Sequence, residues 1–125
     1  MAALTIQTKE KPAVVNLAQS TGKSADASGT PLSVVAALAG HIAVIDKLVI
    51  TVGSAISFTV NTTGGELVDS QYLAANTSWT LPQGMSIRGN AVGLAIRITT
   101  SGAGNVSFFA QSHYEKAVPD LNLYP

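Results

Sequence analysis

The sequence has no cysteine among its 125 residues. This absence excludes a disulfide framework and any metal site built from thiolates. Charged side chains are also scarce, at 11% of the chain, and the seven acidic residues balance the seven basic ones. With no basic excess to attract phosphate backbones or anionic lipid, binding to nucleic acid or to a membrane surface is disfavoured.

Long apolar runs are missing as well. No stretch approaches 18 uninterrupted apolar residues, which is about the length that a membrane-spanning helix requires. The opening MAALTIQTKEKP lacks the apolar core of a signal peptide, so we expect synthesis in a cytoplasm. We therefore expect the three N-x-S/T sites, at Asn61, Asn76 and Asn105, to stay unmodified.

What the chain does have is a high apolar content, 46% of its residues, in a length typical of one domain. Serine, threonine, asparagine and glutamine take the place of charges on its expected surface. A neutral polar surface of this kind suits burial against other subunits, because fewer charges must be desolvated.

One stretch, LAQSTGKS (17–24), ends in the three residues that close a phosphate-binding P-loop. The complete motif needs a glycine five residues before Gly22, and that position is Leu17. It also needs a helix that starts at the Lys-Ser pair, whereas the residues that follow are typical of a loop. We therefore expect an exposed loop over 20–31 and no nucleotide site.

Alternation of apolar and polar residues predicts several short strands. Residues 55–62 place Ile56, Phe58 and Val60 on one face. In 105–115 the neighbours Phe108 and Phe109 must face opposite sides, so one of them lies in the core and the other serves a covered face or an interface. Further strands are expected within 13–18, 42–52 and 85–101, the last with Leu94, Ile96 and Ile98 on one face, and 70–76 and 77–82 are expected to form short strands or a broad loop.

The stretch 32–38 is ambiguous between helix and strand. Thr30-Pro31 could begin a helix and Gly40 could end it. The β-branched pair Val34-Val35 and the β-branched residues after Gly40 instead favour a strand that bends at the glycine and continues as a longer strand.

Six to eight short strands, glycine-rich turns and no amphipathic helix predict an all-β fold, an antiparallel jelly-roll-like β-sandwich. We place the sandwich at 32–115. An N-terminal arm with a short strand and a loop would occupy 1–31, and an extended C-terminal arm would occupy 116–125.

The residues that could carry chemistry are few and scattered. His41 and His113 lack the spaced partner histidine of a metal site. Glu66 and Asp69, with Asn61, form a thin ligand set for a hard cation, and the two acids are more typical of a solvated turn than of a glycosidase pair. No nucleophile elbow is present. We predict no catalytic residue, metal or cofactor, and thus a protein that is not an enzyme.

Four segments in this order resemble small β-sandwich virion structural proteins of tailed bacteriophages, which include head-decoration proteins. The segments are VVAALAGHIAVIDKLVIT (34–51), SAISFTV (54–60), LAANTSWTLPQGM (73–85) and GNAVGLAIRITTSGAGNVSFFAQSHYE (89–115). His41 departs from the family pattern, in which a basic residue often follows the bend glycine. The resemblance covers about residues 33–115 and leaves both arms unmatched.

The resemblance implies a capsid decoration protein that binds the major capsid protein, forms a homo-oligomer, often a trimer, and stabilises the head at the capsid surface of the virion. The alternative is a carbohydrate-binding β-sandwich module, for example in a phage tail or fibre, with Trp79, Tyr72 or Tyr114 stacking on sugar rings. For Trp79 we favour packing in the core or in a contact between subunits over stacking on a sugar ring. The interface candidates are Leu4, Ile6, Val14, Trp79, Phe109, His113, Tyr114, Leu121, Leu123 and Tyr124.

Overall fold

The computed structural model describes the chain from residue 14 to residue 116, with side chains from residue 18 onward. Residues 1–13 of the predicted N-terminal arm and residues 117–125 of the predicted C-terminal arm, and with them several of the interface candidates, lie outside the described residues. These candidates are Leu4, Ile6, Leu121, Leu123 and Tyr124. Val14 is described as backbone only.

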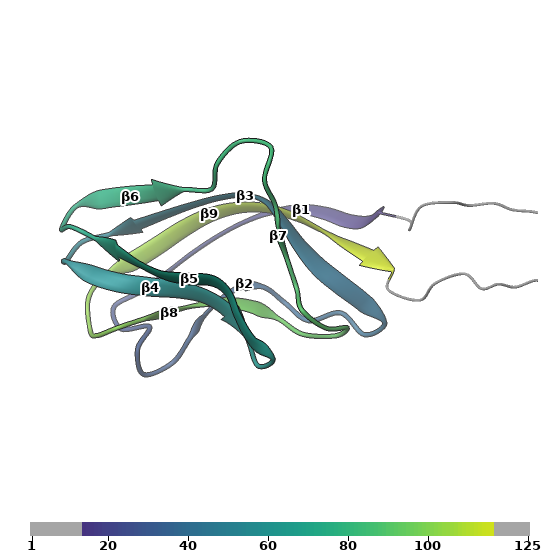
Figure 1. The fold of residues 1–125 in the computed structure, drawn as a ribbon, viewed down its shortest axis with the longest axis horizontal. Helices are drawn as coiled ribbons and strands as arrows, with labels where there is room; N and C mark the ends of the chain where they lie inside the picture. Colours follow the sequence, from purple (N-terminus) through teal and green to yellow (C-terminus); the bar gives the residue numbers. More distant parts are fainter. Residues whose placement is uncertain (1–13, 117–125) are drawn as a thin grey trace, which may run out of the picture.

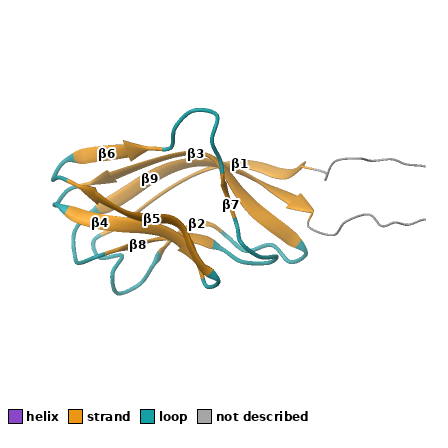
Figure 2. Ribbon diagram, in the orientation of Figure 1, coloured by secondary structure: helices purple, strands orange, loops and turns teal. Residues whose placement is uncertain are grey.

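The described chain is built from strands and loops, without a helix (Figure 2). The strands are β1 (Val14–Ser24), β2 (Leu32–Val35), β3 (His41–Val52), β4 (Ile56–Thr62), β5 (Gly65–Leu73), β6 (Thr77–Thr80), β7 (Ile87–Arg88), β8 (Ile96–Thr100) and β9 (Val106–Lys116). The predicted all-β antiparallel sandwich is confirmed. The count is nine strands, above the predicted six to eight, and the shortest of them is the two-residue β7.

The strands form two sheets that pack face to face (Figure 1). The five-stranded sheet has the order β1-β9-β3-β6, with β7 also paired to β3, and the four-stranded sheet has the order β2-β8-β4-β5. The strands pair as they would in one long hairpin whose tip lies between β4 and β5. The pairs are β1 with β9, β2 with β8, β3 with β6 and β4 with β5. Successive pairs fall in alternate sheets, so the hairpin is rolled up as in a jelly roll.

The expected loop over 20–31 is wrong in its first part, because β1 continues to Ser24. Its outward residues Gln19, Thr21 and Lys23 alternate with small inward residues, and every one of them pairs with β9. The serines and the glycine are typical of loops in isolation, but a long partner strand supplies the hydrogen bonds that hold them extended. The sandwich therefore includes β1 and begins earlier than residue 32.

The stretch 32–38, which was ambiguous between helix and strand, forms a strand over residues 32–35. β2 ends at Val35, and the chain turns at Gly40, whose φ of 75° lies in the left-handed region that favours glycine. β5 begins at Gly65, earlier than the predicted 70–76. Within 85–101, Ile96 and Ile98 lie on β8 and share its buried face as expected, whereas Leu94 lies in the loop between β7 and β8.

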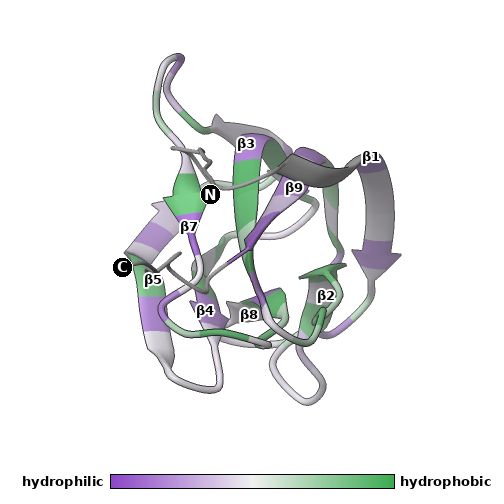
Figure 3. Ribbon diagram, turned by 90° about the vertical axis from the view of Figure 1, so that its right-hand side faces the viewer, coloured by the Kyte–Doolittle hydropathy of each residue, from purple (hydrophilic) through white to green (hydrophobic). Residues whose placement is uncertain are grey.

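The core fills the space between the sheets. Ile45, Leu48 and Ile50 of β3 face Phe58 and Val60 of β4, and all five are buried. As the alternation predicted, Phe108 faces this core and Phe109 faces away. Figure 3 shows the two sheets from the end at which the described chain begins and ends.

Two β-bulges shape the five-stranded sheet. One lies in β1 between Val15 and Ala18, and the other lies in β3 between Ile45 and Lys47. At the second bulge two successive residues, Asp46 and Lys47, are both exposed. A bulge changes which face the following residues present, so these two positions place charge on the outer side of the sheet.

Candidate interaction face of the five-stranded sheet

The outer side of the five-stranded sheet carries rows of side chains that the strand register brings together. The rows, starting where β9 begins, are Lys23, Ser107, Thr51 and Ser78, then Thr21, Phe109, Val49 and Thr80, then Gln19, Gln111 and Lys47. We call these residues the open face. No segment within residues 14–116 covers it, since its residues on β1 and β6 and the side chains of Thr51 and Lys47 are exposed.

The centre of the open face is apolar. Phe109 and Val49 are direct cross-strand partners in β9 and β3, and both are only half-buried. Threonines stand on either side of them, Thr21 on β1 and Thr80 on β6. An aromatic and a β-branched side chain lie here among hydroxyls and amides. A partner can desolvate such a surface at little electrostatic cost, because these groups are uncharged.

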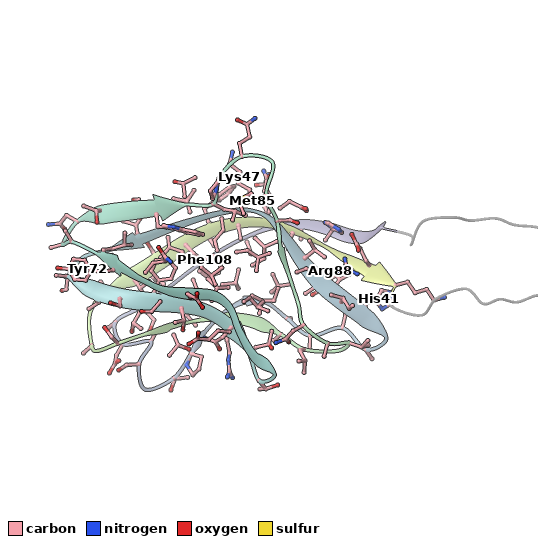
Figure 4. All side chains as sticks on the ribbon, in the orientation of Figure 1. His41, Lys47, Tyr72, Met85, Arg88 and Phe108 are labelled. Carbon is pink, nitrogen blue, oxygen red and sulfur yellow. The ribbon has the colours of Figure 1, made fainter. Side chains whose placement is uncertain are left out.

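A projecting loop forms a rim along one edge of the open face. β6 and β7 both pair with β3, and the loop between them leaves the sheet at the β3 bulge, after a hydrogen bond of 2.8 Å from the amide of Leu81 to the carbonyl of Leu48. The loop rises above the five-stranded sheet in Figures 1 and 3. It carries Met85, which is 57% exposed and is labelled in Figure 4.

A charged cluster lies on the same side of the sheet, toward the end where the described chain begins and ends. His113 Nδ1 lies 2.5 Å from Asp46 Oδ2, and its Nε2 lies 2.8 Å from Glu115 Oε2. Arg88 donates to the other oxygen of Glu115. Because both ring nitrogens face carboxylate oxygens, only the doubly protonated imidazolium can donate to both.

The protonation of this cluster follows from its contacts. Burial acts to lower the pKa of His113, whose side chain is 11% exposed, but the hydrogen bonds to Glu115 and Asp46 outweigh burial and raise the pKa above its ordinary 6.5. The hydrogen bond from Arg88, with that from His113, holds the pKa of Glu115 below its ordinary range. The cluster is thus a chain of alternating charges at mildly acidic pH.

The described interface candidates divide into two groups. Phe109 lies on the open face and His113 in the charged cluster beside it. Trp79 and Tyr114 instead make contacts within the chain: the ring of Trp79 packs edge-on against Phe58 with centroids 5.4 Å apart, and the hydroxyl of Tyr114 donates to the carbonyl of Ala36 at 2.6 Å.

The weak metal and acid–base candidates are not brought together. Within residues 14–116 there is no group of three His, Cys, Asp or Glu side chains placed to hold a metal ion. Asn61 is engaged by Arg97, whose Nε donates to its Oδ1 at 2.8 Å, and by Thr99. Glu66 and Asp69 are exposed on β5.

Sequence reasoning missed most of the open face. Two signals pointed to it: the adjacent pair Phe108-Phe109, which forces one ring outward, and the charged pair Asp46-Lys47 inside an otherwise apolar strand, which marks the bulge. Thr21 and Lys23 were missed because β1 was expected to end before them.

Comparison with known proteins adds no relative. No protein-family model matches the sequence, and no curated protein matches it. Among residues 14–116 no helix is long and apolar enough to cross a membrane.

Proposed function

We propose that this protein is a non-enzymatic structural subunit that assembles with copies of itself through the open face, and that it serves as a capsid decoration protein of a tailed bacteriophage. The observation that carries the proposal is the uncovered outer side of the five-stranded sheet, with Phe109 and Val49 at its centre. Large apolar groups on an uncovered face mark contact sites.

The size of this side of the sheet suits a subunit contact. β9 has 11 residues, about 36 Å at roughly 3.3 Å per residue, and four strands spaced about 4.8 Å apart span about 19 Å. The open face spans less than half of this length, from Ser107 to Gln111 on β9, and β6 has only four residues, so the open face supplies part of the roughly 800 Å² that each partner buries in a standard interface, and the rest must come from its surroundings. The rim loop with Met85 adds to this area, and methionine adapts readily to a partner surface.

The decoration role has two further supports. The first is the sequence resemblance to virion structural proteins. The second is the position of the ends of the described chain: Val14 pairs with Glu115, so the described chain begins and ends at one end of the sandwich. Contacts that exist only in an assembled shell would stabilise the shell by mass action.

The test of self-assembly is the mass of the full-length protein in solution, measured by light scattering after size exclusion, with Phe109→Glu and a matched control. The control is Tyr72→Glu, an aromatic that is 68% exposed on β5 of the other sheet. We expect a small symmetric oligomer for the wild type and for Tyr72→Glu. We expect a folded monomer for Phe109→Glu, because desolvating a charge at the centre of the interface is too costly.

A monomeric wild type would overturn self-assembly. So would an unchanged oligomer in Phe109→Glu, which would show that the open face is not the contact. The capsid role is tested separately by co-sedimentation with expanded heads of the phage that encodes the chain. Binding of the wild type is expected, and an oligomer that ignores the heads would refute decoration while leaving self-assembly intact.

A second candidate function is carbohydrate binding, and one observation favours it. Of the three aromatic residues proposed as sugar platforms, Tyr72 keeps an exposed ring, at 68%. It stands opposite Ser57 at the β4–β5 edge of the four-stranded sheet. A glycan array that shows binding by the wild type and loss of binding in Tyr72→Ala would support this function, and an array without hits would remove it.

A further inference from the structure

A groove of about 720 Å³ lies at the end of the sandwich opposite to the chain ends, where β1 and β3 end and β9 begins. Its walls include Lys23, Thr51, Gly53, Asn76, Asn105 and Ser107. Backbone hydrogen bonds of 2.9 Å hold the surrounding loops together, from Gly53 to Asn105 and from Gly104 to Ala25. The groove is thus built on strand ends that are fixed to each other.

The polar groups of the groove are available to a ligand. Within residues 14–116 no side-chain hydrogen bond or ion pair engages Lys23, Asn76 or Asn105, whereas the neighbouring Thr51 bonds Ser78 and Ser24 bonds the amide of Asp26. No aspartate or glutamate lines the groove. Lys23 therefore has no acidic partner in the groove and gives it one net positive charge.

Asn76 lies in the turn between β5 and β6. Its φ of 60° is the only left-handed value among the described residues other than glycine, and asparagine adopts this conformation readily in turns. The conformation places an amide at the groove wall, beside the loop that carries Asn105.

We propose that this groove binds a sugar acid, with the carboxylate at the ammonium of Lys23 and the ring hydroxyls at the amides and hydroxyls of Asn76, Asn105 and Ser107. Amides and hydroxyls both donate and accept hydrogen bonds, as sugar hydroxyls do, while an ammonium only donates and so selects an anion. The volume lies within the range of small-molecule sites. This site goes beyond the structural function, but its walls share Lys23, Thr51 and Ser107 with the open face.

A phosphate ligand fits the groove less well. Lys23 is the single cation in its lining, and Ser24 is followed by a loop rather than by a helix N-terminus that would hold a dianion. The Gly-Lys-Ser sequence that resembles a P-loop therefore contributes its lysine to the groove and not a phosphate cradle.

The experiment is a titration of the isotope-labelled full-length protein with glucuronate, followed by amide chemical shifts. Glucose and acetate are the matched ligands, since each retains only half of the proposed chemistry. We expect saturable shifts at Gly53, Asn76 and Asn105 with glucuronate, and binding that is about tenfold weaker with glucose, because glucose lacks the charge-assisted hydrogen bond.

Two lysine variants locate the charge. Lys23→Gln should weaken glucuronate binding about tenfold and remove the preference over glucose, whereas Lys116→Gln, an exposed lysine at the opposite end of β9 and outside the groove and the open face, should leave binding unchanged. The proposal is overturned by an absence of saturable shifts, by equal binding of glucuronate and acetate, or by an unchanged affinity in Lys23→Gln. The same titration of Phe109→Glu, whose open face is not covered by a second copy, separates a missing site from one occluded by self-assembly, so the two proposals can fail independently.

Discussion

A Cβ atom on Gly22 would lie 2.7 Å from Cε2 of Phe108, its cross-strand partner on the inner side of the five-stranded sheet. The glycine that makes LAQSTGKS look like a phosphate-binding loop is therefore there for packing. It leaves room for an aromatic ring of the core, and its neighbour Lys23 consequently faces outward and lines the groove.

Gly22→Ala should lower the free energy of unfolding by about 1–3 kcal/mol, because the added methyl group overpacks the core against Phe108. The matched control is Gly102→Ala, at a glycine with no atom within 4 Å of the added Cβ and no left-handed φ. The control should be neutral or slightly stabilising. Urea unfolding of both variants measures the difference, and equal stabilities would contradict the packing role of Gly22.

The stability of the protein should depend on pH through His113. Its raised pKa means that the stabilisation is complete below the ordinary value of 6.5 and is lost as the pH rises through the folded-state pKa. Glu115 has a lowered pKa, so its stabilisation is complete above the ordinary 4.5 and is lost as the pH falls. The thermal unfolding midpoint should therefore be highest between about pH 4.5 and 6.5.

The control for this prediction is His113→Gln, which keeps a polar side chain but cannot titrate. Its unfolding midpoint should be lower than that of the wild type at pH 5.5, and the decline above pH 6.5 should be absent. A wild type whose stability rises from pH 5.5 to pH 8 would show that the imidazolium is not the favoured form.

Phe58→Ala should destabilise the fold by about 3–5 kcal/mol, because a buried ring is removed and the cavity is only partly refilled. The same change should loosen Trp79, which packs against this ring. Trp79 fluorescence is therefore expected to shift to longer wavelength in the native variant. Tyr72→Ala, at an exposed ring, should change neither stability nor fluorescence; an unshifted spectrum in Phe58→Ala would contradict the contact.

Asn61→Ala should cost about 1–2 kcal/mol, because Arg97 and Thr99 each lose a hydrogen-bond partner. Asn61 is buried on the four-stranded sheet, so water replaces its amide only in part. The matched control is Gln83→Ala, which removes an exposed amide from the rim loop and should change stability little. Chemical denaturation of the two variants compares their stabilities directly. An unchanged stability in Asn61→Ala would show that the hydrogen bonds of Asn61 to Arg97 and Thr99 do not stabilise this sheet.

The sequence was sufficient for features that depend on local alternation. The pattern around Ile56, Phe58 and Val60 predicted a strand with one buried face, and the pair Phe108-Phe109 predicted one inward and one outward ring. Both follow from the two-residue period of an extended chain, which needs no knowledge of the partner strand. The absence of an amphipathic helical pattern and the many turn residues were likewise enough for an all-β sandwich.

The tertiary structure alone decided which residues share a face and where weak strands continue. Residues 20–24 have loop composition, yet they form part of β1 because β9 supplies a long partner in register. The strand order placed Asp46, Arg88 and His113 in one cluster, although they are far apart in the sequence. Alternation is local and is encoded in successive residues, whereas register and strand order depend on the packing of the whole chain, and they determine the open face and the groove.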